Sequence, residues 1–169
     1  MIVTRDFFLR LYTYNDWANH ACLTAAAKLG TADYTRPHGV GWQSVRGILT
    51  HIMAADRVWL NRWQGASPSG LEQDEEATPT VEALQAAWDD IMRARRAYLA
   101  ELTPDDLDGP LEYRNTKGVL YQQPLWELLF HVVNHGSDHR GHVSTLLTGM
   151  GSPTVPLDYI AWIRDNPIA

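Results

Sequence analysis

Four of the seven histidines in this chain fall within one short segment, HVVNHGSDHRGH at 131–142. His135 and His139 are four residues apart, so on a helix they lie one turn apart and about 40° from one another. This spacing lets two imidazoles reach a single metal ion, as the paired histidines of H-E-x-x-H helices do. Leu128 and Leu146 project in nearly the same direction, which indicates that the histidine pair faces the interior of the protein.

A metal site needs at least a third ligand, and sites that carry out chemistry often keep a fourth position open. His51 is the best candidate, because it lies in an apolar helical stripe with Ile48 and Val58. A histidine buried there without a partner would cost on the order of a few kcal/mol, and a metal is one way to offset that cost. Spacing alone leaves His131 and His142 open as alternatives. A core histidine that hydrogen-bonds to a neighbour is a further interpretation.

Other polar residues near the histidines carry weaker signals. Gly136 stands where an H-E-x-x-H helix has its Glu, so no general base is visible on this helix. Asp138 and Arg140 flank the candidate ligands and could orient a ligand or anchor a substrate, but a solvated or interface charge pair is the stronger expectation. Three further charged residues are expected at a helix surface: Asp56, Arg57 and Arg62.

Four long segments must position these residues. Apolar residues recur at helical spacing in the ranges 4–29, 44–64, 78–102 and 124–147. Thr4 and Ser44 are suitable N-caps, whereas Pro79 and Pro124 suit the first helical position. The run Thr103-Pro104-Asp105 is expected to end the third helix.

The connections complete the predicted fold. The expected elements are a loop at 65–79, a short β-hairpin with a Gly-containing turn at 111–122, and a short final helix at 157–164. Matched long helices with apolar stripes predict an all-α four-helix bundle. The connections are long enough that these patterns do not fix the order in which the helices run.

Composition narrows the class of protein. A length of 169 residues predicts one domain, 1–169. The net charge of -6 argues against nucleic-acid binding and against docking on anionic lipid. No signal peptide and no membrane span is expected. The single cysteine, Cys22, excludes an internal disulfide and favours a reducing, cytoplasmic location; we expect it to be a small buried hydrophobe.

Several motifs together resemble the DinB family, or DinB/YfiT-like superfamily, of metal-binding four-helix proteins. The similar segments cover the chain from about residue 4 to residue 165. They are YNDWAN (14–19), SVRGILTHIMAADRVWLNRW (44–63), the hairpin with Tyr113, Asn115 and Gly118, PLWELLFHVVNHGSDHRGHV (124–143) and LDYIAWIRD (157–165).

The resemblance implies a ligand set and a topology that spacing leaves open. The family's three metal ligands map onto His51, His135 and His139. It implies helices in up-down-down-up order, a homodimer, and nickel or zinc with water at an open position. His142 stands where the family most often has Gln, and His131 matches a position that is usually not a ligand.

The resemblance also implies a function. Relatives include metal-dependent thiol transferases, which suggests a thiol S-transferase-like or hydrolase-like enzyme whose substrate is a low-molecular-weight thiol or another small molecule. Its catalytic residues remain unknown. The alternative is a non-catalytic metal-binding protein of the stress response, and a further one is a structural bundle whose histidines belong to the core.

Overall fold

Four long helices make up most of the fold in the computed structural model, which describes residues 3–39, 41, 44–66, 75–153 and 155–167. The long helices are α1 (Arg5–Ala26), α3 (Val45–Trp63), α4 (Val81–Glu101) and α6 (Leu125–Gly149). The shorter elements are α2 (Thr31–Thr35), α5 (Pro104–Asp108), β1 (Pro110–Arg114), β2 (Leu120–Pro124) and α7 (Tyr159–Asp165). The predicted all-α bundle with a hairpin and a final short helix is confirmed. No helix in these ranges is long and apolar enough to cross a membrane.

Hydroxyl caps determine where the first three long helices begin. The side chain of Thr4 accepts from the backbone N–H of Phe7, and that of Ser44 accepts from Gly47. α4 begins after Thr80, which caps it in the same way, so the prediction that Pro79 is the first helical residue is wrong. The Thr80 hydroxyl satisfies an exposed N–H of the first turn, and this fixes the helix start at Val81, two residues beyond the proline.

The hairpin meets α6 at a proline. β1 and β2 pair antiparallel, with Tyr113 opposite Tyr121 and Pro110 opposite Pro124. Neither proline has an N–H to donate, so the ladder ends at this pair. Pro124 is therefore the last residue of β2 and the N-cap of α6, rather than the first helical residue that was predicted. At the other end of the hairpin, Gly118 supplies the positive φ of 77° that its turn requires.

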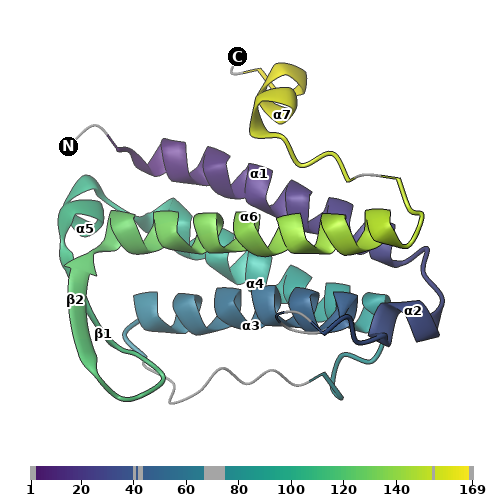
Figure 1. Ribbon diagram of the computed structural model, residues 1–169. Helices are drawn as coiled ribbons and strands as arrows, with labels where there is room; N and C mark the ends of the chain where they lie inside the picture. Colours follow the sequence, from purple (N-terminus) through teal and green to yellow (C-terminus); the bar gives the residue numbers. More distant parts are fainter. Residues whose placement is uncertain (1–2, 40, 42–43, 67–74, 154, 168–169) are drawn as a thin grey trace.

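The bundle has up-down-down-up order (Figure 1). α1 and α6 run in one direction, and α3 and α4 run in the other. α6 packs against both α1 and α3, and α4 packs against both as well. The consequence for the histidines is that α3 and α6, which are not consecutive in the chain, become antiparallel neighbours.

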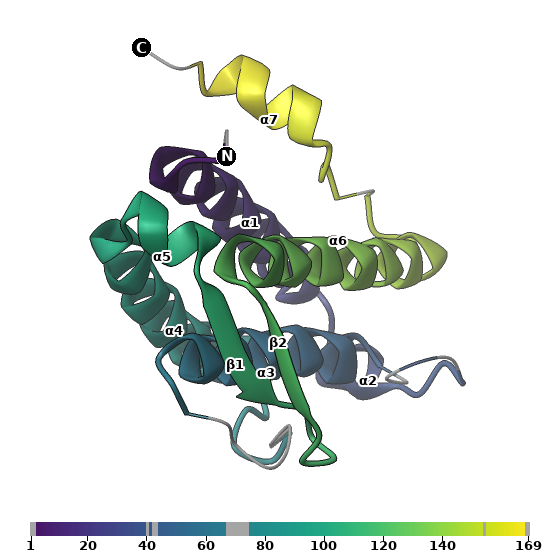
Figure 2. The ribbon, with the colours of Figure 1, turned by 90° about the vertical axis from the view of Figure 1, so that its left-hand side faces the viewer.

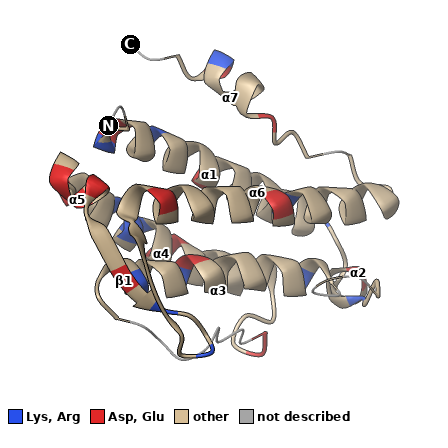
Figure 3. Ribbon diagram, turned by 60° about the vertical axis from the view of Figure 1, so that its left-hand side comes forward, with Lys and Arg blue, Asp and Glu red and all other residues tan. Residues whose placement is uncertain are grey.

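Two short helices were not predicted. α2 follows α1, and α5 lies beside the hairpin at one end of the bundle (Figure 2). α5 begins with a capping box: Asp106 N donates to Thr103 Oγ1 at 3.2 Å, and Thr103 N donates to Asp106 Oδ2 at 2.8 Å. Figure 3 shows the acidic residues that gather on this helix. The run Thr103-Pro104-Asp105 follows the end of α4, as expected, but it also starts a new helical turn.

The core is divided into two large apolar clusters. One surrounds Trp88 and fills the half of the bundle that contains the starts of α3 and α4. The other surrounds Leu129 and fills the half next to the hairpin. Between them, the middle of the bundle buries polar side chains, namely Asn15, Asn19, His51, Asp56, Arg95 and Arg140. The candidate site lies in this polar middle layer.

Candidate metal centre

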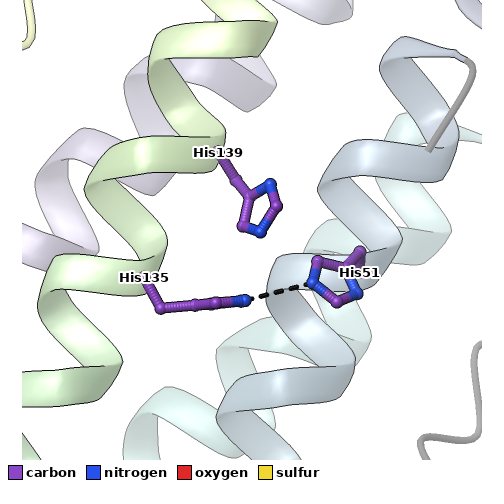
Figure 4. A group of neighbouring side chains, drawn as sticks. All are labelled: His51, His135 and His139. Atoms are coloured by element: carbon purple, nitrogen blue, oxygen red, sulfur yellow. Dashed lines mark hydrogen bonds between the residues drawn. The ribbon is translucent and has the colours of Figure 1, made fainter. Parts of the chain in front are cut away.

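Three histidines meet between α3 and α6. The rings of His135 and His139 point from α6 toward His51 on α3 (Figure 4). The Nε2 atoms of His51 and His135 are 3.1 Å apart, and the ring centroids of His139 lie 4.6 Å from His51 and 4.4 Å from His135. One potential ligand nitrogen from each residue lies within 4.8 Å of the other two. The structure thus brings together all three residues that were predicted as metal ligands; that they bind a metal stays a prediction.

The geometry of the three rings fits a metal ion. Zn–N bonds of about 2.0–2.1 Å at tetrahedral angles place two ligand nitrogens about 3.3 Å apart, close to the 3.1 Å between His51 and His135. The Nδ1 atom of His139 is buried and makes no hydrogen bond within the described residues. One potential ligand nitrogen of each ring lies within 4.8 Å of the other two, so a single ion could be shared by all three.

The three imidazoles are held in their neutral form. Burial, together with the smaller effect of the neighbouring rings of His135 and His139, lowers the pKa of His51 to about 3. Burial and the ring of His139 lower the pKa of His135 to about 4, and burial also lowers the pKa of His139. A metal displaces protons from its ligands, so rings that are already neutral near pH 7 are prepared to bind one.

The two alternative histidines lie outside this set. His131 packs against Trp59, with ring centroids 5.1 Å apart, and its own ring is 6.0 Å from that of His135. His142 is exposed and lies 5.7 Å from His139, with which it and Asp138 form a second possible ligand group. The two groups share His139. An ion bound by His51, His135 and His139 would therefore leave the second group with only Asp138 and His142.

A buried arginine fixes the helix that carries the pair. Arg140 is 1% exposed, and its Nη1 donates to the Oδ1 atoms of Asn15 at 2.7 Å and Asn19 at 2.8 Å. Its Nη2 donates to Ser137 Oγ at 3.0 Å. The expectation of a solvated charge pair with Asp138 is therefore wrong, because α6 turns Arg140 inward against α1 and leaves Asp138 in water. This anchoring sets the rotation of α6 that directs the histidines toward α3.

Gly136 has a steric role beside this anchor. A Cβ atom at this position would lie 2.7 Å from Arg140 Nη1 and 3.2 Å from Asn15 Oδ1. Any larger residue would push the guanidinium out of its place, so the Glu of an H-E-x-x-H helix has no room here. The absence of a general base at this position follows from the way α6 packs on α1.

The charged residues expected at the surface of α3 are mostly buried. Asp56 is 2% exposed and accepts from Trp88 Nε1 at 2.8 Å and from Arg95 Nη1 at 2.7 Å. Arg95 also pairs with Asp16. Burial alone would lower the pKa of Arg95, but the charges of Asp56 and Asp16 together raise it. The prediction failed because charges on three different helices neutralise one another inside the bundle, which no single-helix pattern reveals.

Arg57 and Arg62 are the other two residues of α3 that were expected at the surface. Arg62 is 5% exposed, so its expected place at the surface is wrong, whereas Arg57 is half-buried. The guanidinium of Arg62 lies 4.6 Å from the ring centroid of Trp59 and 5.3 Å from that of Tyr113. These two aromatic rings contact the guanidinium of Arg62, whereas the buried Arg95 is contacted by carboxylates.

Cys22 is fully buried, as expected, and burial raises the pKa of its thiol to about 12.

The fold and the histidines together define a class: up-down-down-up four-helix bundles that gather three histidines between two antiparallel helices. The sequence model of the DinB family matches residues 1–166. Protein DinB of Bacillus subtilis (strain 168) is 30% identical over 159 residues, which are 91% of this chain and 92% of that protein. The chain therefore belongs to the DinB family, and the resemblance predicted from its motifs is confirmed.

A solved structure shows the same fold. The crystal structure of a DinB-like protein from Bacillus cereus ATCC 10987 superposes with a TM-score of 0.70. The superposition covers 91% of this chain and 97% of that chain, at 19% sequence identity. The fold is thus retained although most side chains differ.

Proposed function

We propose that the protein binds one divalent transition-metal ion, nickel or zinc, through His51, His135 and His139. We further propose that it uses an open coordination position to act on a small molecule, in a thiol S-transferase-like or hydrolase-like reaction. The observation that supports this most is the convergence of three neutral imidazoles from two helices, with Nε2 atoms of His51 and His135 3.1 Å apart. Three protein ligands with a fourth position free are typical of catalytic rather than structural sites.

The chain's own residues would supply position, and the ion would supply the chemistry. A divalent ion favours the deprotonated form of a thiol or a water molecule near pH 7. The histidines would hold it between α3 and α6, where His51 is buried and His135 and His139 are partly buried. Arg140 keeps these two rings in place through its bonds to Asn15 and Asn19.

A non-catalytic metal-binding protein of the stress response is the second candidate. Gly136 favours it, because this residue leaves α6 without the general base that H-E-x-x-H enzymes carry. A screen of thiol conjugation and hydrolysis with metal-loaded protein separates the two, since any turnover that disappears on chelation rules out the second candidate.

Elemental analysis tests the site itself. We expect about one equivalent of metal in the protein as isolated or after loading with zinc or nickel, and a large loss in His51→Ala, His135→Ala and His139→Ala. His20→Ala is the matched control, because His20 bonds to Asp89 at 3.0 Å on the other side of the bundle. Equal metal content in all four variants would refute the assignment.

Thermal unfolding gives an independent reading of the same site. A metal present at 100 times its Kd stabilises the native state by about 2.7 kcal/mol. In a protein of this size that corresponds to a rise in Tm of about 5–10 °C. The rise should appear with zinc or nickel, vanish with a chelator, and be absent in His51→Ala.

A further inference from the structure

Arg62 is a buried cation with no anionic partner in the part of the chain that the structure describes. It is 5% exposed, its Nε is buried and makes no hydrogen bond, and no carboxylate lies within ion-pair distance among the described residues. Burying a charge that is not paired costs several kcal/mol, roughly. Two other arginines are also buried in the bundle, and both have hydrogen-bond partners. Arg95 pairs with Asp56 and Asp16. Arg140 donates to the side-chain oxygens of Asn15, Asn19 and Ser137.

Two aromatic rings hold the guanidinium in place without neutralising it. Its central carbon lies 4.6 Å from the Trp59 ring centroid and 5.3 Å from that of Tyr113. Cation–π contacts attract the guanidinium but do not neutralise its charge, so they offset only part of the cost of burial. Tyr113 in turn stacks on Tyr121, with centroids 5.8 Å apart, so the hairpin forms one wall around Arg62. A planar guanidinium fixed in this way presents its remaining N–H groups in a fork that suits a carboxylate or a phosphate.

The position of Arg62 connects it to the histidine centre. Arg62 follows His51 by eleven residues on α3, which places both on the same helix face. Because α3 and α6 are antiparallel, the same direction along α6 leads from His135 to His131. His131 lies between the histidine centre and the rings around Arg62. Its ring centroid is 6.0 Å from that of His135 and 5.1 Å from that of Trp59.

We propose that Arg62, between Trp59 and Tyr113, binds the oxyanion end of a small molecule whose other end reaches the three histidines. The anion site itself does not depend on the proposed function, whereas the reach to the histidines rests on it. Eleven residues span about 16 Å along a helix, and an arginine side chain leans back toward the N-terminus, so the two ends are about 10–16 Å apart. The ligand is therefore an elongated molecule with a carboxylate or phosphate at one end and the reacting group at the other.

The first experiment tests the anion site alone. Full-length protein labelled with ¹⁵N-arginine is titrated with acetate and, separately, with inorganic phosphate at constant ionic strength. The Nε–Hε resonance of Arg62, assigned by its absence in Arg62→Lys, should move and saturate with at least one of these ions, and the two arms show which oxyanion is preferred. A resonance that does not move with either ion would overturn the proposal, and this result needs no variant that must fold.

Substitution provides the second measurement. The affinity for the same ion can be measured from the shift of the indole N–H resonance of Trp59. This affinity should be at least tenfold lower in Arg62→Met than in the wild type, because a charge-assisted hydrogen bond is lost. Arg96→Gln, the matched change of an exposed arginine on α4, should bind like the wild type. Equal binding by Arg62→Met and the wild type would overturn the proposal. Metal content is measured in the same samples and should stay unchanged in Arg62→Met, so failure of the anion site and failure of the metal site are distinguishable.

The third experiment tests the reach to the histidines. Protein loaded with cobalt(II) is titrated with mercaptooctanoic acid and with octanethiol, and thiolate binding is followed by visible absorption. The acid should bind more tightly than the alkyl thiol in the wild type, and this advantage should vanish in Arg62→Met. An equal advantage in both proteins would show that the carboxylate does not reach Arg62.

Discussion

Replacing Arg95 by methionine should destabilise the protein strongly, because Arg95 is the only cation within hydrogen-bond distance of Asp56 among the described residues. Both side chains lie in the middle of the core, with Arg95 1% and Asp56 2% exposed. Methionine fills a similar volume and can still pack on Tyr12, whose ring centroid lies 4.6 Å from the guanidinium. The substitution therefore removes the charge while it leaves most of the packing in place, and Asp56 is left buried beside Trp88 alone.

The size of the effect follows from this uncompensated carboxylate. Removing one partner of a buried ion pair costs about 3–5 kcal/mol. A domain of this size is stable by only about 5–15 kcal/mol, and the loss corresponds to a fall in Tm of about 6–20 °C. Changing Asp56 to asparagine in the same protein removes the stranded charge and keeps an oxygen to accept from Trp88 Nε1. The double variant Asp56→Asn/Arg95→Met should therefore recover at least about 2 kcal/mol relative to Arg95→Met.

Urea unfolding at pH 7, followed by circular dichroism, measures both values. Arg96→Gln serves as the control, because it removes a positive charge from the adjacent, exposed position on α4. A loss of less than 1 kcal/mol in the free energy of unfolding of Arg95→Met, roughly the effect of a surface pair, would refute a buried ion pair at this position. A double variant no more stable than Arg95→Met would refute the stranded charge on Asp56.

Two further predictions concern the loss of stability at acid pH and the packing of α6 around Gly136. The folded-state pKa values of His51, about 3, and His135, about 4, lie below the ordinary value of 6.5. Below pH 6.5 the metal-free folded protein therefore binds fewer protons than the unfolded chain. Its stability falls as the pH is lowered from 6.5 toward 3–4. Urea unfolding with a chelator should show a loss of about 2 kcal/mol per histidine between pH 7 and pH 5, partly offset by Asp16, whose pKa burial raises to about 6; a free energy that stays constant would contradict this. Gly136→Ala should destabilise by about 1–3 kcal/mol, although alanine favours helix, because its methyl group displaces Arg140; a rise in Tm would show that the guanidinium moves without cost.

The elements were predictable because each depends on a local pattern. Thr4 and Ser44 precede apolar residues at helical spacing, and both cap the helices that follow. The hairpin was predictable from its turn around Gly118 and its flanking apolar residues. α5 escaped prediction because the capping box of Thr103 and Asp106 serves a helix of a single turn, too short to show any periodicity.

The site was predictable only in part. Helical angles selected His135 and His139, and the apolar stripe of its helix made His51 the best third candidate. Spacing still left His131 and His142 open, because the choice depends on which helix packs against α6. The family resemblance supplied His51, and the antiparallel contact of α3 and α6 gives the physical reason. The buried charges were missed for the same cause: Asp56 and Arg95 lie 39 residues apart, and nothing within either helix shows that they meet.

The order of the helices has a consequence for how the protein is made. His51 and His135 are separated by 84 residues, and α6 is the last long helix to leave the ribosome. During synthesis, α3 would be complete long before its partner exists, so a nascent chain would offer an ion only one of the three imidazoles. An ion bound by all three would cross-link α3 and α6 only after the bundle is complete. It would join the two ends of a long loop whose closure costs about 4 kcal/mol of chain entropy. Metal uptake would then distinguish completed chains from truncated ones.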